Sequence, residues 1–153
     1  GAQAGLSWRT VLHRRESYGE AFAGFDPAIV AGYTPDKLED IRENSGVIRN
    51  KLKIASAVKN AKAFIEIQHE FGSFDKYLWA YVDDTPVMNG FSSWEMVPAE
   101  TELSKQISKD LKKRGFSFVG PTIMYAYMQS VGMVNDHLTT CFRYQQIVDE
   151  YGR

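Results

Sequence analysis

The sequence contains a single cysteine among its 153 residues. One cysteine excludes an internal disulfide and favours a reducing compartment. No run of eighteen uncharged apolar residues occurs, and no charged-then-apolar leader opens the chain, so the sequence predicts neither a membrane span nor a secretory signal. These absences predict a soluble, cytoplasmic protein that has no membrane partner.

The chain also lacks an excess of charge of one sign, because its formal net charge is −1. This balance argues against a uniformly basic nucleic-acid-binding protein. Two segments are nevertheless basic, since residues 46–65 carry a local charge of +5 and residues 105–114 carry +4. They are either ordinary solvated helix faces or parts of one DNA-binding face.

The chain does contain enough apolar residues for a hydrophobic core, since 44% of its residues are apolar and 13% are aromatic. A length of 153 residues is enough for one domain with a real core and short for two. No strand alternation, internal repeat or low-complexity tract is present. We therefore expect an all-α fold with a single helical domain over residues 1–153, and a monomer.

Apolar positions in residues 46–65 recur at three- and four-residue spacing, which predicts an amphipathic helix. The expected apolar stripe comprises Ile48, Leu52, Ala55, Val58, Ala61 and Ile65. Residues 6–22 show helical spacing too, and residues 73–82 predict a short helix. The pairs Asp26-Pro27 and Thr34-Pro35 each predict an N-cap followed by proline in the first turn of a short helix.

The segment between these elements and the C-terminal helices, residues 83–100, is long for a structureless connection. We expect it to pack against the domain through Phe91 and Trp94. After it, the sequence predicts a helix that Thr101 caps and Gly115 closes.

The segment "KKRGFSFVGPTIMYAYM" (112–128) joins the basic helix to an apolar one through a tight turn. Pro121 begins the second helix, which ends at Gly132 and is expected in the core. Backbone N–H groups at such a helix start favour a phosphate oxygen. The segment either binds the DNA backbone or is an ordinary corner between two helices.

A His-x₃-Cys pair, His137 and Cys141, holds the only cysteine of the chain. On a helix these two side chains would lie on one face, as two ligands of a tetrahedral zinc site do. The alternative interpretation is a buried cysteine beside a capping histidine. Asp136, just before the pair, is equally typical of a helix N-cap.

Four blocks, taken together, resemble the bacterial DNA-3-methyladenine glycosylase I family of the helix-hairpin-helix superfamily. They are "QAGLSWRTVLHRRESYGEAF" (3–22), "GVIRNKLKIASAVKNAKAF" (46–64), "LSKQISKDLKKRGFSFVGPTIMYAYMQSVGMVNDH" (103–137) and Cys141. The resemblance runs in order over nearly the whole chain and is weakest in residues 83–100. Its motifs "QAGLSW", "KKRGF-x-FVG" and "VNDH-x₃-C" are specific in combination.

The resemblance implies a DNA-repair enzyme that hydrolyses the N-glycosidic bond of 3-methyladenine in alkylated double-stranded DNA. The damaged nucleotide would be flipped into a pocket and the free base released. It assigns Trp8 the role of a stacking wall for the cationic base, although the residues around Trp8 alone would make it a core aromatic. It also implies DNA contacts from Gly5, Leu6, Lys112, Lys113, Val119, Gly120 and Thr122.

Phe118-Val119-Gly120 departs from the Gly-apolar-Gly pattern of the generic hairpin. Because the first glycine is missing, we expect fewer backbone contacts to phosphate. The family's base-reading glutamate matches a position just before Gly1, so no catalytic residue is assigned, and we expect the 153 residues to lack the N-terminal segment of the family. The resemblance also implies a structural zinc ion with His137 and Cys141 as two ligands; its Cys and His partners match positions in that N-terminal segment.

Two alternatives remain at this point. One is a non-catalytic helix-hairpin-helix module that binds DNA and has no base pocket. The other is a related glycosylase with a different lesion preference, because the glutamate is one of the residues that read the base.

Overall fold

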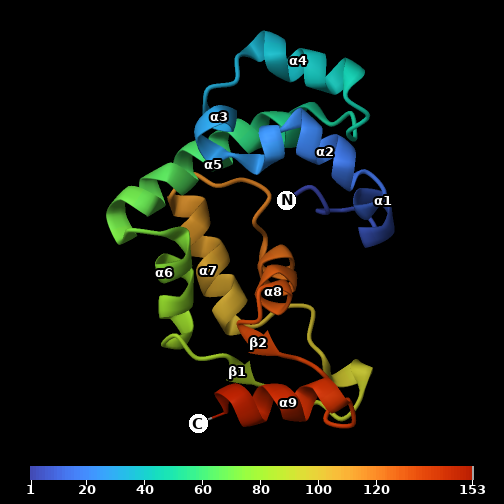
Figure 1. Cartoon of the computed structure of the whole chain (residues 1–153), viewed down its shortest axis with the longest axis vertical. Coiled ribbons are helices and arrows are strands. Elements are labelled where there is room, and N and C mark those ends of the chain that lie inside the picture. Colours follow the sequence, from blue (N-terminus) through green and yellow to red (C-terminus); the bar gives the residue numbers. More distant parts are fainter. Residues whose placement is uncertain (153) are drawn as a thin grey trace. The chain divides into compact units, whose positions relative to one another are not determined.

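The computed structural model describes residues 1–152. By its contacts the chain forms two compact units: Gly1–Phe74 with Leu111–Val119, and Asp75–Asp110 with the chain from Gly120 onward. In the described residues helices dominate and the only sheet is a pair of two-residue strands, which confirms the all-α prediction (Figure 1). One domain over residues 1–153 stays a prediction, since two compact units can belong to one domain, and residue 153 lies outside the described range.

The first unit contains short helices packed on one long helix (Figure 1). Its elements are α1 (Trp8–Leu12), α2 (Arg15–Ala21), the 3₁₀ helix η1 (Ala23–Phe25), α3 (Pro27–Ala31), α4 (Pro35–Asn44) and α5 (Lys51–Phe71). Helices α3 and α4 both contact α5. Phe22, Val30, Ile41 and Ile54 are buried together between them and form the core of this unit.

The starts of α3 and α4 confirm the two predicted caps. Asp26 accepts a hydrogen bond from the Ala28 N–H at 2.9 Å, and Thr34 Oγ1 accepts one from the Lys37 N–H at 3.2 Å. In each helix proline is the first residue, where its missing N–H has no intrahelical partner to lose.

Helix α5 differs from its prediction in bounds and in face. It begins at Lys51, after Asn50 caps it by accepting from the Lys53 N–H at 3.0 Å, and it continues to Phe71. The expected stripe is wrong at Leu52, which is 73% exposed, and at Ala55, which is also exposed. The buried positions of α5 are Ile54, Ala61, Ala63 and Ile67, of which only Ala61 belongs to the expected stripe. Apolar residues occur on more than one side of this helix. Which of them are buried therefore depends on the face that α3 and α4 cover.

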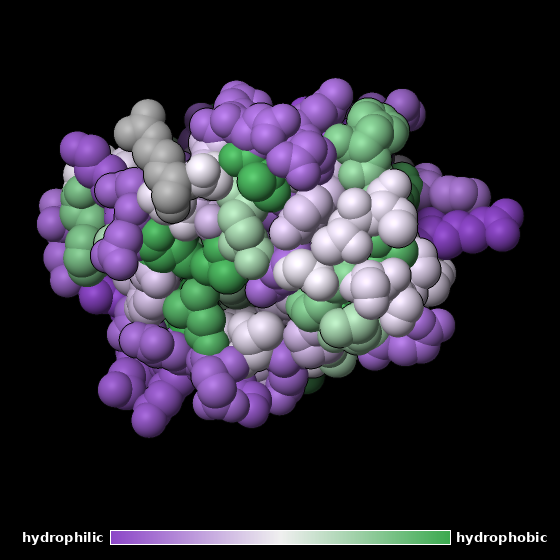
Figure 2. All heavy atoms as spheres, turned by 90° about the horizontal axis from the view of Figure 1, so that it is seen from below, coloured by the Kyte–Doolittle hydropathy of each residue, from purple (hydrophilic) through white to green (hydrophobic). Residues whose placement is uncertain are grey.

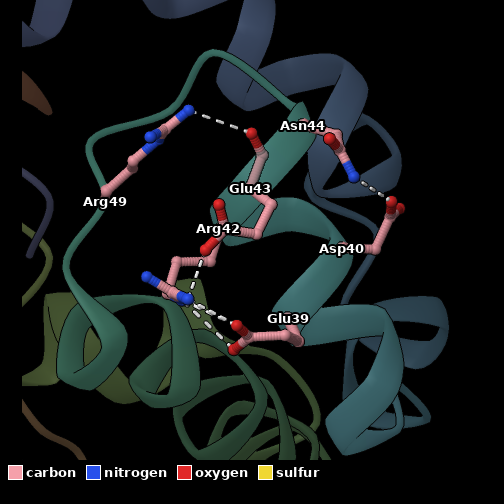
Figure 3. A network of polar contacts seen from close by, with 6 residues as sticks. All are labelled: Glu39, Asp40, Arg42, Glu43, Asn44 and Arg49. Atoms are coloured by element: carbon pink, nitrogen blue, oxygen red, sulfur yellow. Dashed lines mark hydrogen bonds and ion pairs between the residues drawn. The ribbon is translucent and has the colours of Figure 1, made fainter.

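The exposed side of α4 carries a polar network (Figure 3). Arg42 pairs with Glu39 and with Glu43, and Asn44 Nδ2 donates to Asp40 at 2.9 Å. Arg49 Nη2 donates to the Glu43 carbonyl at 3.2 Å. Because these pairs are exposed, solvent screens their attraction and each contributes little to the stability of the fold.

The second unit contains the C-terminal helices and the small sheet (Figure 1). Its elements are most of α6 (Phe74–Trp79), η2 (Ala80–Val82), β1 (Val87–Met88), η3 (Trp94–Met96), the first nine residues of α7 (Glu102–Lys113), α8 (Pro121–Ser130), β2 (Val134–Asn135) and α9 (Phe142–Tyr151). β1 and β2 run parallel, with Val87 opposite Val134 and Met88 opposite Asn135.

Helix α7 begins and ends as predicted. Thr101 and Ser104 exchange hydrogen bonds, Ser104 N–H to Thr101 Oγ1 at 3.2 Å and Thr101 N–H to Ser104 Oγ at 2.9 Å. This reciprocal pair satisfies N–H groups at the helix start. At the other end Gly115 has φ +98°, a conformation that glycine adopts without steric cost.

The loop of residues 83–100 contains β1 and η3 and packs only in part as expected. Phe91 is half-buried, and its carbonyl accepts from the Thr139 N–H at 2.9 Å. The predicted contact through Trp94 is wrong, because Trp94 is 70% exposed.

Apolar side chains also reach the surface elsewhere. On the face drawn in Figure 2, hydrophobic side chains are exposed among hydrophilic ones. Among residues 1–152, no helix is both long enough and apolar enough to span a bilayer.

Candidate functional site

The motif "QAGLSW" forms two consecutive turns followed by the start of α1. The Ala4 N–H donates to the Gly1 carbonyl at 3.1 Å, and the Leu6 N–H donates to the Gln3 carbonyl at 2.7 Å. Gly5 has φ +72°, the left-handed conformation that suits glycine. We call residues 1–6 the N-terminal turn. Gly5 is exposed and Leu6 half-buried in it.

Trp8 is the first residue of α1, directly after the N-cap Ser7, whose Oγ accepts from the Thr10 N–H at 3.2 Å. The Trp8 side chain is 52% exposed. The interpretation of Trp8 as a core aromatic is therefore wrong, and the indole has surface that a ligand can cover. Its role as the stacking wall stays a prediction.

Lys53 of α5 contacts the N-terminal turn directly. Its ammonium donates to the Ala2 carbonyl at 2.9 Å and also to the Ala4 carbonyl. The same ammonium lies 5.8 Å from the centre of the Phe118 ring, close enough for attraction by the face of the ring. Burial lowers the pKa of this ammonium below its ordinary value.

Residues 114–119, which follow α7, form a second segment of interest that we call the hairpin loop. Asn60 Oδ1 accepts from the Ser117 N–H at 2.8 Å, and Asn60 Nδ2 donates to the Ser117 carbonyl at 3.0 Å. Lys59 Nζ donates to Ser117 Oγ at 3.1 Å. Arg114 pairs with Glu70 at 2.6 Å. Helix α5 thus contacts both the hairpin loop and the N-terminal turn.

Phe118, at the position of the missing hairpin glycine, has φ +57°. This is the left-handed region that costs a non-glycine residue roughly 1–2 kcal/mol. The backbone here therefore adopts the conformation that glycine favours, although the residue is phenylalanine. The expectation of fewer phosphate contacts stays a prediction.

The other predicted DNA contacts lie in both units. Lys112 and Lys113 are exposed at the end of α7, and Val119 is buried at the end of the hairpin loop. In the second unit Gly120 is the N-cap of α8, with no side-chain cap, and Thr122 Oγ1 donates to Glu100 at 3.4 Å. Within the first unit, α5 holds the N-terminal turn and the hairpin loop.

A cavity of about 320 Å³ lies in the first unit, and no residue of the sequence had been assigned to its lining. Its lining includes the polar residues Lys53, Ser56 and Asn60. The aromatic members are Tyr18, Phe22, Phe25, Phe64 and Phe116. Trp8 does not line it. The recurrence of aromatic residues at positions 18, 22 and 25 was the available sequence signal.

The pair His137 and Cys141 lies in a turn, not on a helix as predicted. Cys141 has extended backbone angles and is the N-cap of α9, which begins only at Phe142. Cys141 Sγ nevertheless lies 3.9 Å from His137 Nδ1. Residues 1–152 contain no group of three or more His, Cys, Asp and Glu side chains that could hold a metal.

Asp136 accepts three hydrogen bonds within the second unit. The donors are the Tyr125 hydroxyl at 2.5 Å, Gln129 Nε2 at 2.8 Å and Asn89 Nδ2 at 2.7 Å. The interpretation of Asp136 as the N-cap of a helix at His137 is wrong, because no helix begins there. The carboxylate instead connects α8, the segment after β1 and the turn that carries His137.

Comparison with known proteins gives consistent results. A family model described as "Methyladenine glycosylase" matches residues 1–144. The DNA-3-methyladenine glycosylase of Haemophilus influenzae is 48% identical over 141 residues, which cover 92% of this chain and 76% of that protein. The DNA-3-methyladenine glycosylase 1 of Escherichia coli is 40% identical over 144 residues, covering 94% of this chain and 77% of that protein.

Solved structures agree with this similarity. A crystal structure of 3-methyladenine DNA glycosylase I superposes with a TM-score of 0.88 at 42% identity, covering 92% of this chain and 78% of that one. A variant of 3-methyladenine DNA glycosylase I in complex with 3-methyladenine has a TM-score of 0.89 at 32% identity, covering 92% and 76%.

Proposed function

The chain belongs to the methyladenine glycosylase family, and from this premise we propose that it removes 3-methyladenine from alkylated double-stranded DNA. The reaction is hydrolysis of the N-glycosidic bond after the nucleotide has been flipped out of the duplex. The observation that carries the proposal is the 48% identity to a DNA-3-methyladenine glycosylase over 92% of the chain.

Trp8 is the base-binding residue in this proposal. Its exposed indole can stack on a flipped base, which is worth roughly 1–3 kcal/mol. The methylated base is a cation, so the face of the indole adds about 0.5–2 kcal/mol that a neutral adenine does not receive. This added attraction is a physical basis for choosing damaged bases over normal ones.

Gly5 and Leu6 lie in the turn just before Trp8, a position from which they can contact the gap that a flipped nucleotide leaves. Lys112, Lys113, Val119, Gly120 and Thr122 are proposed to contact the phosphate backbone. The exposed ammonium groups of the two lysines and the uncapped start of α8 suit phosphate oxygens. Such a protein would act as a monomer in the cytoplasm, where bacterial DNA lies.

Release of the free base separates this proposal from a module that only binds DNA. The full-length protein is incubated with methylated duplex DNA, and free 3-methyladenine is measured by chromatography. Trp8→Ala is expected to lose excision while it retains duplex binding. Trp94→Ala, which removes an exposed indole of the second unit, is the matched control and is expected to retain both.

A protein that binds the duplex and releases no base would contradict the glycosylase proposal. Competition by free 3-methyladenine and by other free alkylated bases tests the lesion preference. Stronger competition by another alkylated base would favour the related-glycosylase alternative.

We also propose that His137 and Cys141 are two ligands of a structural zinc ion. Tetrahedral geometry with ordinary zinc–nitrogen and zinc–sulfur bonds places the two ligand atoms about 3.6 Å apart, near the observed 3.9 Å. A closed site needs two further ligands, and residues 1–152 do not bring them together.

Cobalt substitution tests the zinc site without any activity measurement. The full-length protein loaded with Co²⁺ is expected to show a thiolate-to-metal charge-transfer band that Cys141→Ser removes. Metal analysis that finds no zinc, together with the absence of that band, would contradict the site.

A further inference from the structure

Lys53 connects three parts of the first unit that are distant in sequence. From α5 it donates hydrogen bonds to the carbonyls of Ala2 and Ala4 in the N-terminal turn, 51 and 49 residues away. Its ammonium also lies 5.8 Å from the centre of the Phe118 ring in the hairpin loop. Helix, turn and loop therefore meet at one charged group.

Few hydrogen bonds within the N-terminal turn stabilise its conformation. Its own hydrogen bonds are the two backbone bonds that close the turns and the bond from Gln3 Nε2 to the Leu6 carbonyl at 2.6 Å. Gly5, at φ +72°, adds flexibility in the unfolded chain. The two carbonyls that Lys53 binds lie on either side of Gln3, so the ammonium holds the backbone where the two turns join.

Trp8 depends on this turn for its position. Only Ser7 separates the turn from Trp8, and Ser7 begins α1 through its bond to the Thr10 N–H. None of the residues of α1 is buried, so packing gives the indole little support. A shift of the turn would therefore be passed to the indole along the backbone.

The surroundings of the Lys53 ammonium distinguish it from a phosphate ligand. An ammonium has three donor hydrogens; two of them bind carbonyls, and an aromatic face lies on a further side. Lys53 belongs to the basic segment 46–65, but its contacts are made within the protein.

We propose that Lys53 is a positioning residue for base excision, which holds the N-terminal turn so that Trp8 meets the flipped base in the productive geometry. This inference rests on the proposed glycosylase function. A misplacement of about 1 Å at a reacting site lowers a rate by on the order of 10²-fold. Loss of Lys53 should therefore lower the rate of excision far more than it lowers binding of duplex DNA.

The test compares Lys53→Met, Lys53→Gln and Lys53→Arg in the full-length protein, with Lys51→Met as the matched control. Lys51 is an exposed lysine one half-turn earlier on α5. Measured quantities are the single-turnover rate of 3-methyladenine release, the Kd for undamaged duplex at several salt concentrations, and the melting temperature.

Lys53→Met is expected to lower the excision rate by about tenfold or more, with duplex affinity changed less than about threefold and the salt slope unchanged. Lys53→Arg keeps the charge and the donors and is expected to recover most of the rate. Hydrogen exchange of the backbone over residues 2–8 is expected to be faster in Lys53→Met, while exchange in α9 stays the same.

Three results would overturn the inference. The first is an excision rate in Lys53→Met equal to that of Lys51→Met. The second is a salt slope smaller by about 0.9, which would make Lys53 a phosphate ligand. The third is a loss of excision rate in Lys53→Met and Lys53→Gln that parallels their loss of melting temperature, which would mean that Lys53 contributes only to folding. A wild-type protein that releases no base contradicts the proposed function instead, and the exchange measurement still decides whether Lys53 holds the turn.

Discussion

Asn60 pairs its side-chain amide with both backbone polar groups of Ser117. The Ser117 N–H donates to Asn60 Oδ1 at 2.8 Å, and Asn60 Nδ2 donates to the Ser117 carbonyl at 3.0 Å. The two residues are 57 positions apart in the chain. Both backbone groups of this hairpin-loop residue are therefore hydrogen-bonded to one residue of α5, as both groups of a strand residue can be to its neighbour in a sheet.

Asn60→Leu is expected to reduce the free energy of unfolding by about 2–3 kcal/mol, because it leaves the Ser117 N–H and carbonyl without these partners. Urea denaturation measures the change. Asn44→Ala is the control; its exposed side chain donates to Asp40, and a loss below about 0.5 kcal/mol is expected. Equal losses for the two variants would show that the pairing with Ser117 adds nothing to stability.

Gly115→Ala is expected to destabilise the protein by about 1–2 kcal/mol. The backbone at Gly115 has φ +98°, and no heavy atom lies within 4 Å of the added Cβ, so the cost comes from the backbone conformation alone. Gly19→Ala is the matched control, since Gly19 is inside α2 and its added Cβ also meets nothing within 4 Å. In a helix the same substitution is expected to stabilise by about 0.5–1 kcal/mol. Thermal unfolding compares them, and effects of the same sign would contradict this account.

Stability is expected to fall as pH rises above about 10, in part because of Tyr125. Burial, together with its hydrogen bond to Asp136, raises the pKa of Tyr125 above the ordinary value of 10. The unfolded chain then loses this proton at lower pH than the folded protein does, so the free energy of unfolding decreases with pH in that range.

Tyr125→Phe removes this dependence. Below pH 9 the variant should be less stable than the wild type by a constant amount, about 1–3 kcal/mol for the lost bond to a carboxylate. Above pH 10 the difference should shrink by about 1.4 kcal/mol per pH unit. Urea titrations at successive pH values measure both; a difference that stays constant to pH 11 would show that Tyr125 titrates normally.

Lys112→Ala is expected to weaken binding to undamaged duplex DNA and to reduce the slope of log K against log salt concentration by about 0.9, the contribution of one neutralised phosphate. Fluorescence anisotropy at several salt concentrations measures the slope. Lys37→Ala removes an exposed lysine that pairs with Asp40 on α4 and should leave the slope unchanged. If the two variants behave alike, the end of α7 does not contact the backbone.

Several features of the fold were predictable because the interactions that produce them join residues close in sequence. The caps at Asp26, Thr34 and Thr101 bind N–H groups two or three residues later, and the end of α7 requires only the conformation of Gly115. The motifs "QAGLSW", "KKRGF-x-FVG" and "VNDH-x₃-C", taken together, identified the family, which the match over residues 1–144 confirms.

Predictions that depended on which face of an element is covered were less successful. The apolar stripe of α5 was misplaced at Leu52 and Ala55, and Trp94 was expected to pack against the domain although it is exposed. His137 and Cys141 were expected on a helix and lie in a turn, where their side chains still approach each other. A spacing of four residues is compatible with either conformation.

The sequence by itself therefore determined the helical class, the caps of the helices and the family, since each depends on residue type and on neighbours within a few positions. Only the tertiary structure decided that Lys53 and Asn60 of α5 hold two segments about fifty residues away in opposite directions along the chain. The hydrogen bonds of Lys53 and Asn60 are made to backbone groups, which every residue carries. No pattern of side chains in the sequence therefore predicts them.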